Sequence, residues 1–182
     1  MPCLLTASLC LSVVACASAE QEQPISFAGT GCPADSALPD TITDQEERIF
    51  RIRFDQYDAG KSAKSGQKNR AACSFALPVN VQEGYRVVLT EVIWYGKVSG
   101  TATLNRKYFL AGQPDTAWHK NDLSEQSDST FLITDQQPDG LIASPCGRDV
   151  NIRINSHLQV DNAEGYASLN DGASIKVRWQ NV

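Results

Sequence analysis

The stretch YRVVLTEVIWYGKVSGTATL, residues 85–104, decides the fold class of this sequence. Its first half, YRVVLTEVIWYG, is apolar on both faces of an extended chain, which is typical of a strand in the middle of a sheet. Its second half alternates small or apolar residues with hydroxyl residues: Val98, Gly100, Ala102 and Leu104 against Ser99, Thr101 and Thr103. This alternation predicts a strand with one face in a core and the other in solvent.

Four further segments show the same period of two. Gly-containing turn sequences fall between them, and no window of eleven residues after position 19 carries a helical stripe. We therefore expect an all-β, antiparallel fold, and we favour a jelly-roll-like β-sandwich because it buries the alternating faces of two sheets around one core. The apolar sets of the four segments are Phe50, Ile52 and Phe54; Cys73, Phe75, Leu77 and Val79; Val150, Ile152 and Ile154; and Ile175, Val177 and Trp179.

Composition limits the range of functions. The chain has 182 residues, of which 42% are hydrophobic and 20% charged, so it is long enough for one domain with a proper core. Its formal net charge is −5. An acidic chain disfavours nucleic acid or an anionic membrane surface as its partner.

The N-terminal segment predicts export. Residues 1–19 carry no charge, and Leu4–Val14 has the length of a signal-peptide core, although no Lys or Arg precedes it. Cleavage after Ala17-Ser18-Ala19 would leave a single domain, 20–182, released to the outside or held at the cell surface. Alternatively, Val13-Val14-Ala15 followed by Cys16 resembles a lipobox, and cleavage after residue 15 would leave a lipidated, membrane-anchored Cys16.

Three cysteines lie beyond this segment: Cys32, Cys73 and Cys146. In an oxidising compartment they can form one disulfide and leave one thiol over. A Cys32–Cys73 bridge would close a loop of about 40 residues. The spacing does not suggest zinc, and the two histidines are distant from every cysteine in sequence, so no metal site is predicted. For Cys146 we expect a buried free thiol, with an inter-chain bridge as the alternative.

An ordered set of short phrases resembles a known family. The set begins with Gly29-Thr30-Gly31-Cys32-Pro33 and continues through Lys68-Asn69-Arg70-Ala71-Ala72-Cys73, Gly100-Thr101-Ala102-Thr103-Leu104, Tyr108-Phe109-Leu110-Ala111-Gly112, Ser144-Pro145-Cys146-Gly147 and Val177-x-Trp179. It resembles the secreted proteins of fungi and bacteria grouped as the domain of unknown function 4360. The resemblance implies an extracellular all-β domain with no established activity.

This resemblance also bears on the disulfide. Family members typically end in Trp-x-x-Cys, whereas this chain ends in Trp179-Gln180-Asn181-Val182. One family cysteine is therefore missing. Because Cys146 and the missing cysteine are adjacent in the order, the resemblance favours Cys32 paired with Cys73.

The sequence contains no catalytic constellation. There is no nucleophile elbow, zinc-protease helix, phosphate loop or calcium loop. We considered three residues singly: Glu91, which lies inside an apolar run, and His119 and His157. Glu91 is expected to face solvent or to pair with an arginine such as Arg53, and the alternative is a buried acid with a raised pKa. We predict no catalytic residue and no cofactor.

Exposed aromatic side chains are the remaining candidates for ligand binding. Trp94 and Trp179 lie in strongly apolar strands and are expected in the core. Trp118 stands at the start of a polar segment and is the best candidate for an exposed ligand anchor, with Tyr108 and Tyr166 as further ligand-binding candidates. The main hypothesis is an exported, non-catalytic binding or structural module that meets polysaccharide or cell-envelope components. The alternatives are a carbohydrate-binding module that uses exposed aromatics, a subunit of a surface assembly and, least favoured, a small secreted hydrolase.

Overall fold

The computed structural model describes residues 24–43, 46–113, 116–138, 142–162 and 164–182, and every regular element in them is a β-strand. The predicted signal segment 1–19, its alternative end at residue 15 and Cys16 lie outside the described residues. The strands are β1 (Ser26–Ala28), β2 (Ala37–Thr43), β3 (Glu47–Phe54), β4 (Asp58–Gly60), β5 (Arg70–Val79), β6 (Tyr85–Leu110), β7 (His119–Gln136), β8 (Val150–Val160) and β9 (Tyr166–Asn181). All pairings are antiparallel, so the predicted fold class is confirmed. No helix in the described part of the chain is long and apolar enough to cross a membrane.

Strand β6 belongs to both layers of the molecule. Its first half pairs with β9 and its second half with β8, while β7 follows it along both halves. The pairing registers shift between Tyr95 and Lys97 and between Val98 and Gly100, where Gly100 has a φ of +87°. A hydrogen bond shows that the strand turns between Trp94 and Tyr108: the Trp94 indole N–H donates to the Tyr108 hydroxyl at 2.8 Å. Fourteen residues of straight strand would hold the two side chains roughly 46 Å apart.

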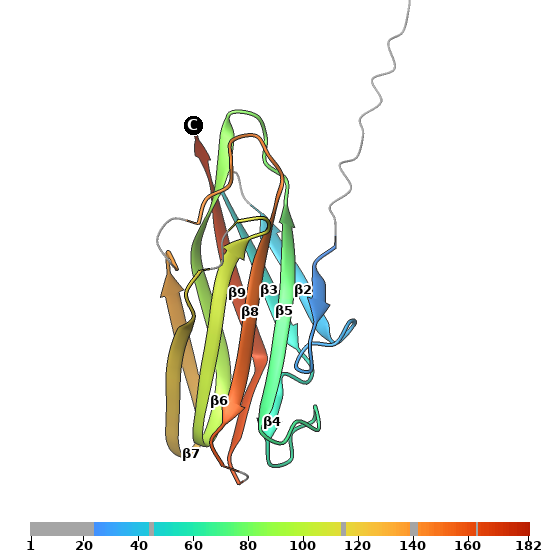
Figure 1. Ribbon diagram of the computed structural model, residues 1–182, viewed down its shortest axis with the longest axis vertical. Coiled ribbons are helices and arrows are strands. Elements are labelled where there is room, and N and C mark those ends of the chain that lie inside the picture. Colours follow the sequence, from blue (N-terminus) through green and yellow to red (C-terminus); the bar gives the residue numbers. More distant parts are fainter. Residues whose placement is uncertain (1–23, 44–45, 114–115, 139–141, 163) are drawn as a thin grey trace, which may run out of the picture.

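The bend produces a two-layered sandwich (Figure 1). One layer has the order β1-β5-β8-β6, and the other has the order β2-β3-β9-β6, with β9 between β3 and the first half of β6. The core lies between the layers. Phe75 on β5 packs against Phe54 on β3 and Trp94 on β6, with ring centroids 6.2 and 6.3 Å apart.

A buried polar network joins the layers on the β7 side. The Arg106 guanidinium donates to both carboxylate oxygens of Asp135, at 2.6 Å from Nε to Oδ2 and 2.5 Å from the terminal nitrogen to Oδ1. These side chains are 2% and 9% exposed. The Tyr108 hydroxyl donates to the same carboxylate, and burial, followed by the Asp135 charge, raises the pKa of Tyr108 well above its usual value. The phenol therefore keeps its proton and the network keeps its donors.

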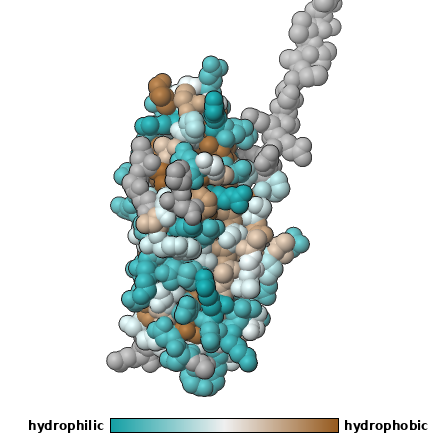
Figure 2. Space-filling view, viewed as in Figure 1, coloured by the Kyte–Doolittle hydropathy of each residue, from teal (hydrophilic) through white to brown (hydrophobic). Residues whose placement is uncertain are grey.

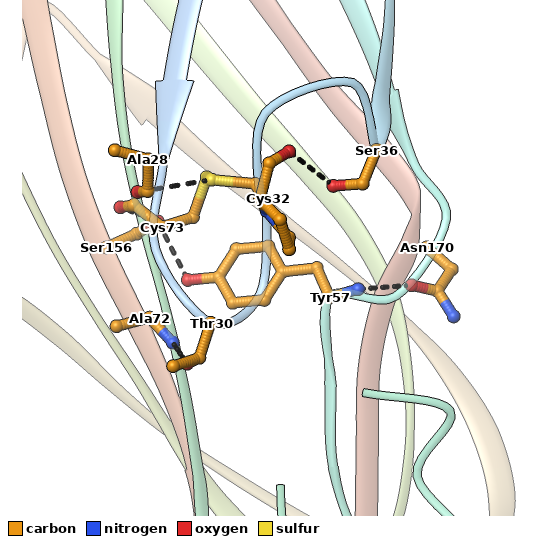
Figure 3. The surroundings of a disulfide bond; sticks show 10 residues. Ala28, Thr30, Cys32, Ser36, Tyr57, Ala72, Cys73, Ser156 and Asn170 are labelled. Atoms are coloured by element: carbon orange, nitrogen blue, oxygen red, sulfur yellow. Dashed lines mark hydrogen bonds between the residues drawn. A yellow bond between two sulfur atoms is a disulfide. The ribbon is translucent and has the colours of Figure 1, made fainter. Parts of the chain in front are cut away.

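A disulfide bond links the β1–β2 connection to β5, on the side of the sandwich away from β7 (Figure 3). Cys32, in the connection from β1 to β2, is bonded to Cys73 on β5, with Cα atoms 5.3 Å apart, so the favoured pairing is confirmed. Beside it, the Tyr57 hydroxyl donates to Ser156 Oγ at 2.8 Å, and Ser156 donates to the Cys73 carbonyl at 3.3 Å. Burial raises the pKa of Tyr57. This hydroxyl chain connects the segment after β3 to β8 and β5 of the other layer.

Cys146 is a free thiol and is exposed, so the expectation of a buried thiol is wrong. The residue lies outside the strands, in a turn where the Gly147 N–H donates to the Tyr85 carbonyl at 2.8 Å. A turn that only borders β6 gives its side chains no facing layer against which to bury.

Replacing Asp135 by Ala is expected to lower the free energy of unfolding by about 3–5 kcal/mol, because the Arg106 guanidinium would stay buried without its partner. Urea denaturation measures this loss. The matched control is Asp122→Ala, which removes an exposed pair with Lys120 and should cost no more than about 1 kcal/mol. Equal losses in the two variants would show that the buried network does not join the layers.

The double variant Cys32→Ser, Cys73→Ser is expected to lose about 4 kcal/mol of stability, since the bridge closes a long loop in the unfolded chain. Urea unfolding of the oxidised protein and of the variant gives the difference. Peptide mapping without reductant should recover the Cys32 and Cys73 peptides as one species while Cys146 reacts with an alkylating agent. A linked peptide containing Cys146 would contradict the pairing.

Candidate functional site

The outer face of β5, β8 and the second half of β6 is a mostly polar surface, in which side chains of neighbouring strands lie in rows across the sheet. Alternate residues of these strands point into the core, and the others point outward. The registers place Asn105 opposite His157 and Lys107 opposite Asn155, and they place His157 opposite Ala72 of β5. The outward residues are Arg70, Ala72 and Ser74 on β5, Arg153, Asn155, His157 and Gln159 on β8, and Thr103, Asn105, Lys107 and Phe109 on β6. Figure 2 shows the side of the molecule on which these strands lie, and it is mostly hydrophilic with separate apolar patches.

Trp118 stands over this surface. It comes directly before β7, and its side chain is 49% exposed. Its ring meets the His157 imidazole edge-on, with centroids 5.2 Å apart. The Lys107 ammonium lies 5.2 Å from the Trp118 ring centre and 5.4 Å from that of Phe109. We call these four residues together with Asn105 the Trp118 face. The indole is held by its neighbours and still leaves half of its surface to solvent.

Cations surround the Trp118 face. Arg70, Lys107, Lys120 and Arg153 lie on or beside it, and the neighbouring acid Asp122 is paired with Lys120 at 2.9 Å. Burial, followed by the charge of Arg70, lowers the pKa of His157 below its usual 6.5. The imidazole is therefore neutral at pH 7 and offers one hydrogen-bond donor and one acceptor.

The other two predicted ligand residues lie elsewhere. Tyr108 is fully buried in the network with Trp94 and Asp135, so its prediction as an exposed ligand-binding residue is wrong. Tyr166 is half-buried at the start of β9, where it borders a shallow hollow with Lys61 and Glu164. Because Tyr166 pairs with Ser99, it lies about eight strand residues, or roughly 26 Å, from the position of Trp118 beside Lys107. The two aromatics do not form one site.

The three residues considered as catalytic candidates, Glu91, His119 and His157, also lie apart from one another. Glu91 lies on the outer face of the β9 layer, opposite Lys176 and Gln136. His157 lies on the outer face of the other layer, and the His119 ring packs 5.7 Å from Tyr108. No acid and imidazole converge in this set, and in the described residues no three His, Cys, Asp or Glu side chains gather as metal ligands.

Sequence reasoning missed Lys107 and Phe109, and the sequence did contain a signal for them. Tyr108 shares its parity with Leu104 and Leu110, both buried, so it belongs to the core set of β6. Lys107 and Phe109 have the opposite parity and must face outward. Extending the alternation from residue 104 to residue 110 would have placed Tyr108 in the core and Lys107 and Phe109 on the outer face.

Comparison with solved structures gives distant matches. The structure of TmCBM61 in complex with β-1,4-galactotriose is 8% identical, with a TM-score of 0.39, over 88% of this chain and 90% of that one. A structure described as CBM4 structure and function is 14% identical, with a TM-score of 0.29, over 79% and 78%. The enzymatically active domain of tailspike protein 4 from bacteriophage CBA120 is 14% identical, with a TM-score of 0.30, over 89% of this chain but only 20% of that one. All three TM-scores are below 0.5, so the ligands and roles of those proteins are not transferred to this chain.

Sequence comparison is more specific. No curated protein matches the chain. The family model for the domain of unknown function DUF4360 matches residues 22–181, which include all nine strands. The resemblance in the short phrases is confirmed, and the chain belongs to the DUF4360 family.

Proposed function

We propose that this protein is an exported, non-catalytic module that binds polysaccharide through the Trp118 face. The observation that carries the proposal is the half-exposed Trp118 indole, which is already held by Lys107 and His157. An aromatic ring fixed before binding loses little side-chain entropy when a ligand arrives. A flat, rigid ring on a sheet surface suits the apolar face of a sugar ring.

The surroundings of the indole suit sugar hydroxyls. A hydroxyl group both donates and accepts hydrogen bonds, so it is best met by groups of both kinds. The amides of Asn105 and Asn155 and the neutral imidazole of His157 supply donors and acceptors in neighbouring rows. A polysaccharide chain lying along the strands would meet such groups at each row.

Two further observations support an exported binder over a hydrolase. Glycoside hydrolysis needs two carboxyl groups that flank one bond. Among the side chains that the structure describes beside the Trp118 face, the acid is Asp122, which is exposed and paired with Lys120. The Cys32–Cys73 disulfide suits an oxidising compartment, in keeping with the export signal expected at residues 1–19.

Trp118→Ala is expected to weaken polysaccharide binding at least tenfold, since a central tryptophan commonly supplies more than about 1.4 kcal/mol of binding energy. Affinity electrophoresis against a panel of plant, fungal and bacterial polysaccharides measures the change. Leu132→Ala is the matched control, because Leu132 is also an exposed apolar residue, 61% exposed, and lies on the other layer. If no polysaccharide in the panel retards the unaltered protein, the proposed function is rejected.

The imidazole of His157 is expected to titrate below pH 6.5 in the folded protein. Because the folded pKa is lowered, its contribution to stability is complete above pH 6.5 and is lost as the pH falls through the folded value. Proton NMR titration, with the His157→Gln variant to assign the signal, gives the pKa. Arg70→Gln should raise the pKa part of the way toward 6.5, because burial still acts, whereas Arg153→Gln should leave it unchanged. A midpoint above 6.5 would contradict the neutral imidazole.

A further inference from the structure

A trough of about 480 Å³ runs over the outer face of the second layer, on the opposite side of the sandwich from the Trp118 face. Strands β2, β3, β9 and β6 all contribute to it. Its volume falls within the range of roughly 300–1,000 Å³ that is usual for small-ligand sites. Its lining includes Leu38, Asp40, Arg51, Arg53, Tyr95 and Ser174, together with Asp171.

Strand β9 contributes Ala173 and Ser174 to the lining of the trough, and Gly172 precedes them. Registers place Ser174 between Arg51 of β3 and Ile93 of β6, and they place Gly172 opposite Tyr95. Gly172 has a φ of +105°, and a Cβ there would lie only 2.1 Å from the Ile52 carbonyl oxygen, so this position cannot carry a side chain. The larger side chains of β3 and β6 therefore stand on both sides of a low centre, roughly 9–10 Å apart at two strand spacings.

The two walls differ in chemistry. On the β6 side, Tyr95 is half-buried and presents an aromatic ring, and on the far rim Leu38 is 52% exposed. On the β3 side, Arg51 and Arg53 are exposed on the same face of one strand. Neither guanidinium forms an ion pair with a carboxylate of the described residues, whereas the exposed Lys61, Lys120 and Arg178 all do.

Charge complementarity identifies the class of occupant. Arg51 and Arg53 offer forked donors, while the carboxylates of Asp40 and Asp171 offer only acceptors. Asp40 lies directly opposite Arg51 in the β2–β3 register, and the two arginines and two acids together leave no net charge that would favour an anion or a cation. A neutral ligand whose hydroxyls both donate and accept can use all four groups, and the Tyr95 ring suits the apolar face of a pyranose.

We propose that this trough is a second ligand site and that it binds a short run of neutral sugar residues. The assignment depends on the trough's own residues and not on the Trp118 face. If both sites are occupied, one molecule holds two sugar chains on opposite sides, and linking two sites in this way raises the apparent affinity for a polysaccharide network.

NMR spectroscopy of the ¹⁵N-labelled protein tests the proposal. The probes are neutral oligosaccharides of three to six units from cellulose, xylan, β-1,3-glucan, β-1,4-galactan and starch, with oligogalacturonate and oligoglucosamine as charged counterparts. At least one neutral probe should shift the amides of Arg53, Gly172 and Ser174 saturably. Tyr95→Ala should weaken that binding at least tenfold. Ser174→Arg, which fills the floor, should do the same, and both Leu132→Ala, beside Tyr95 but outside the trough, and Trp118→Ala should change it less than twofold.

The outcomes separate this site from the proposed function. Shifts confined to the Trp118 indole and Lys107 would overturn the trough while supporting the Trp118 face. Shifts confined to the trough would support the trough as a site and overturn the Trp118 face. No saturable shift at the trough with any neutral probe overturns the proposal, and so does tighter binding of either charged probe than of every neutral one.

Discussion

The bend in β6 is the constraint on which the rest of the structure depends. A strand that turns from one layer into the other must keep its backbone N–H and C=O groups paired on both sides of the bend. Strand β7 does this along both halves of one edge, and β8 and β9 share the other edge. The remaining strands then extend each layer outward. The two layers are thus one continuous hydrogen-bonded sheet, and their outer faces are fixed relative to each other by the same strand.

The two sides of the sandwich are closed by different chemistry. On the β7 side, Arg106, Asp135, Tyr108 and Trp94 satisfy one another inside the core, and such a network is stable only when complete. On the other side a covalent bond acts mainly by restricting the unfolded chain. Both keep the layers in register. That matters for function, because the Trp118 face and the trough are each assembled from rows contributed by several strands.

The sequence predicted strands well and predicted surfaces poorly, for a physical reason. Alternation identifies which residues of a strand share a face, and it supported an antiparallel all-β fold from residues 85–104 outward. It does not show which strands are neighbours. Trp118 was identified from its polar surroundings, but the trough depends on β9 lying beside β6, with Ser174 opposite Ile93, a register between residues 81 positions apart. The error on Tyr108 was avoidable, because its parity follows from Leu104. The error on Cys146 was avoidable as well, because Pro145 and Gly147 flank this residue and mark a turn outside the strands.

The position of β9 has a consequence for how the protein is made. This strand comes last among the nine, yet it lies between β3 and the first half of β6. Strand β3 therefore cannot pair with β9 until residues 166–181 have been made, and the second layer cannot be completed before then. Pairings that join distant parts of a chain form slowly. Until that pairing forms, the backbone groups of β3 and β6 that β9 will cover stay open to solvent, so the last strand to be made is the one that completes the sheet.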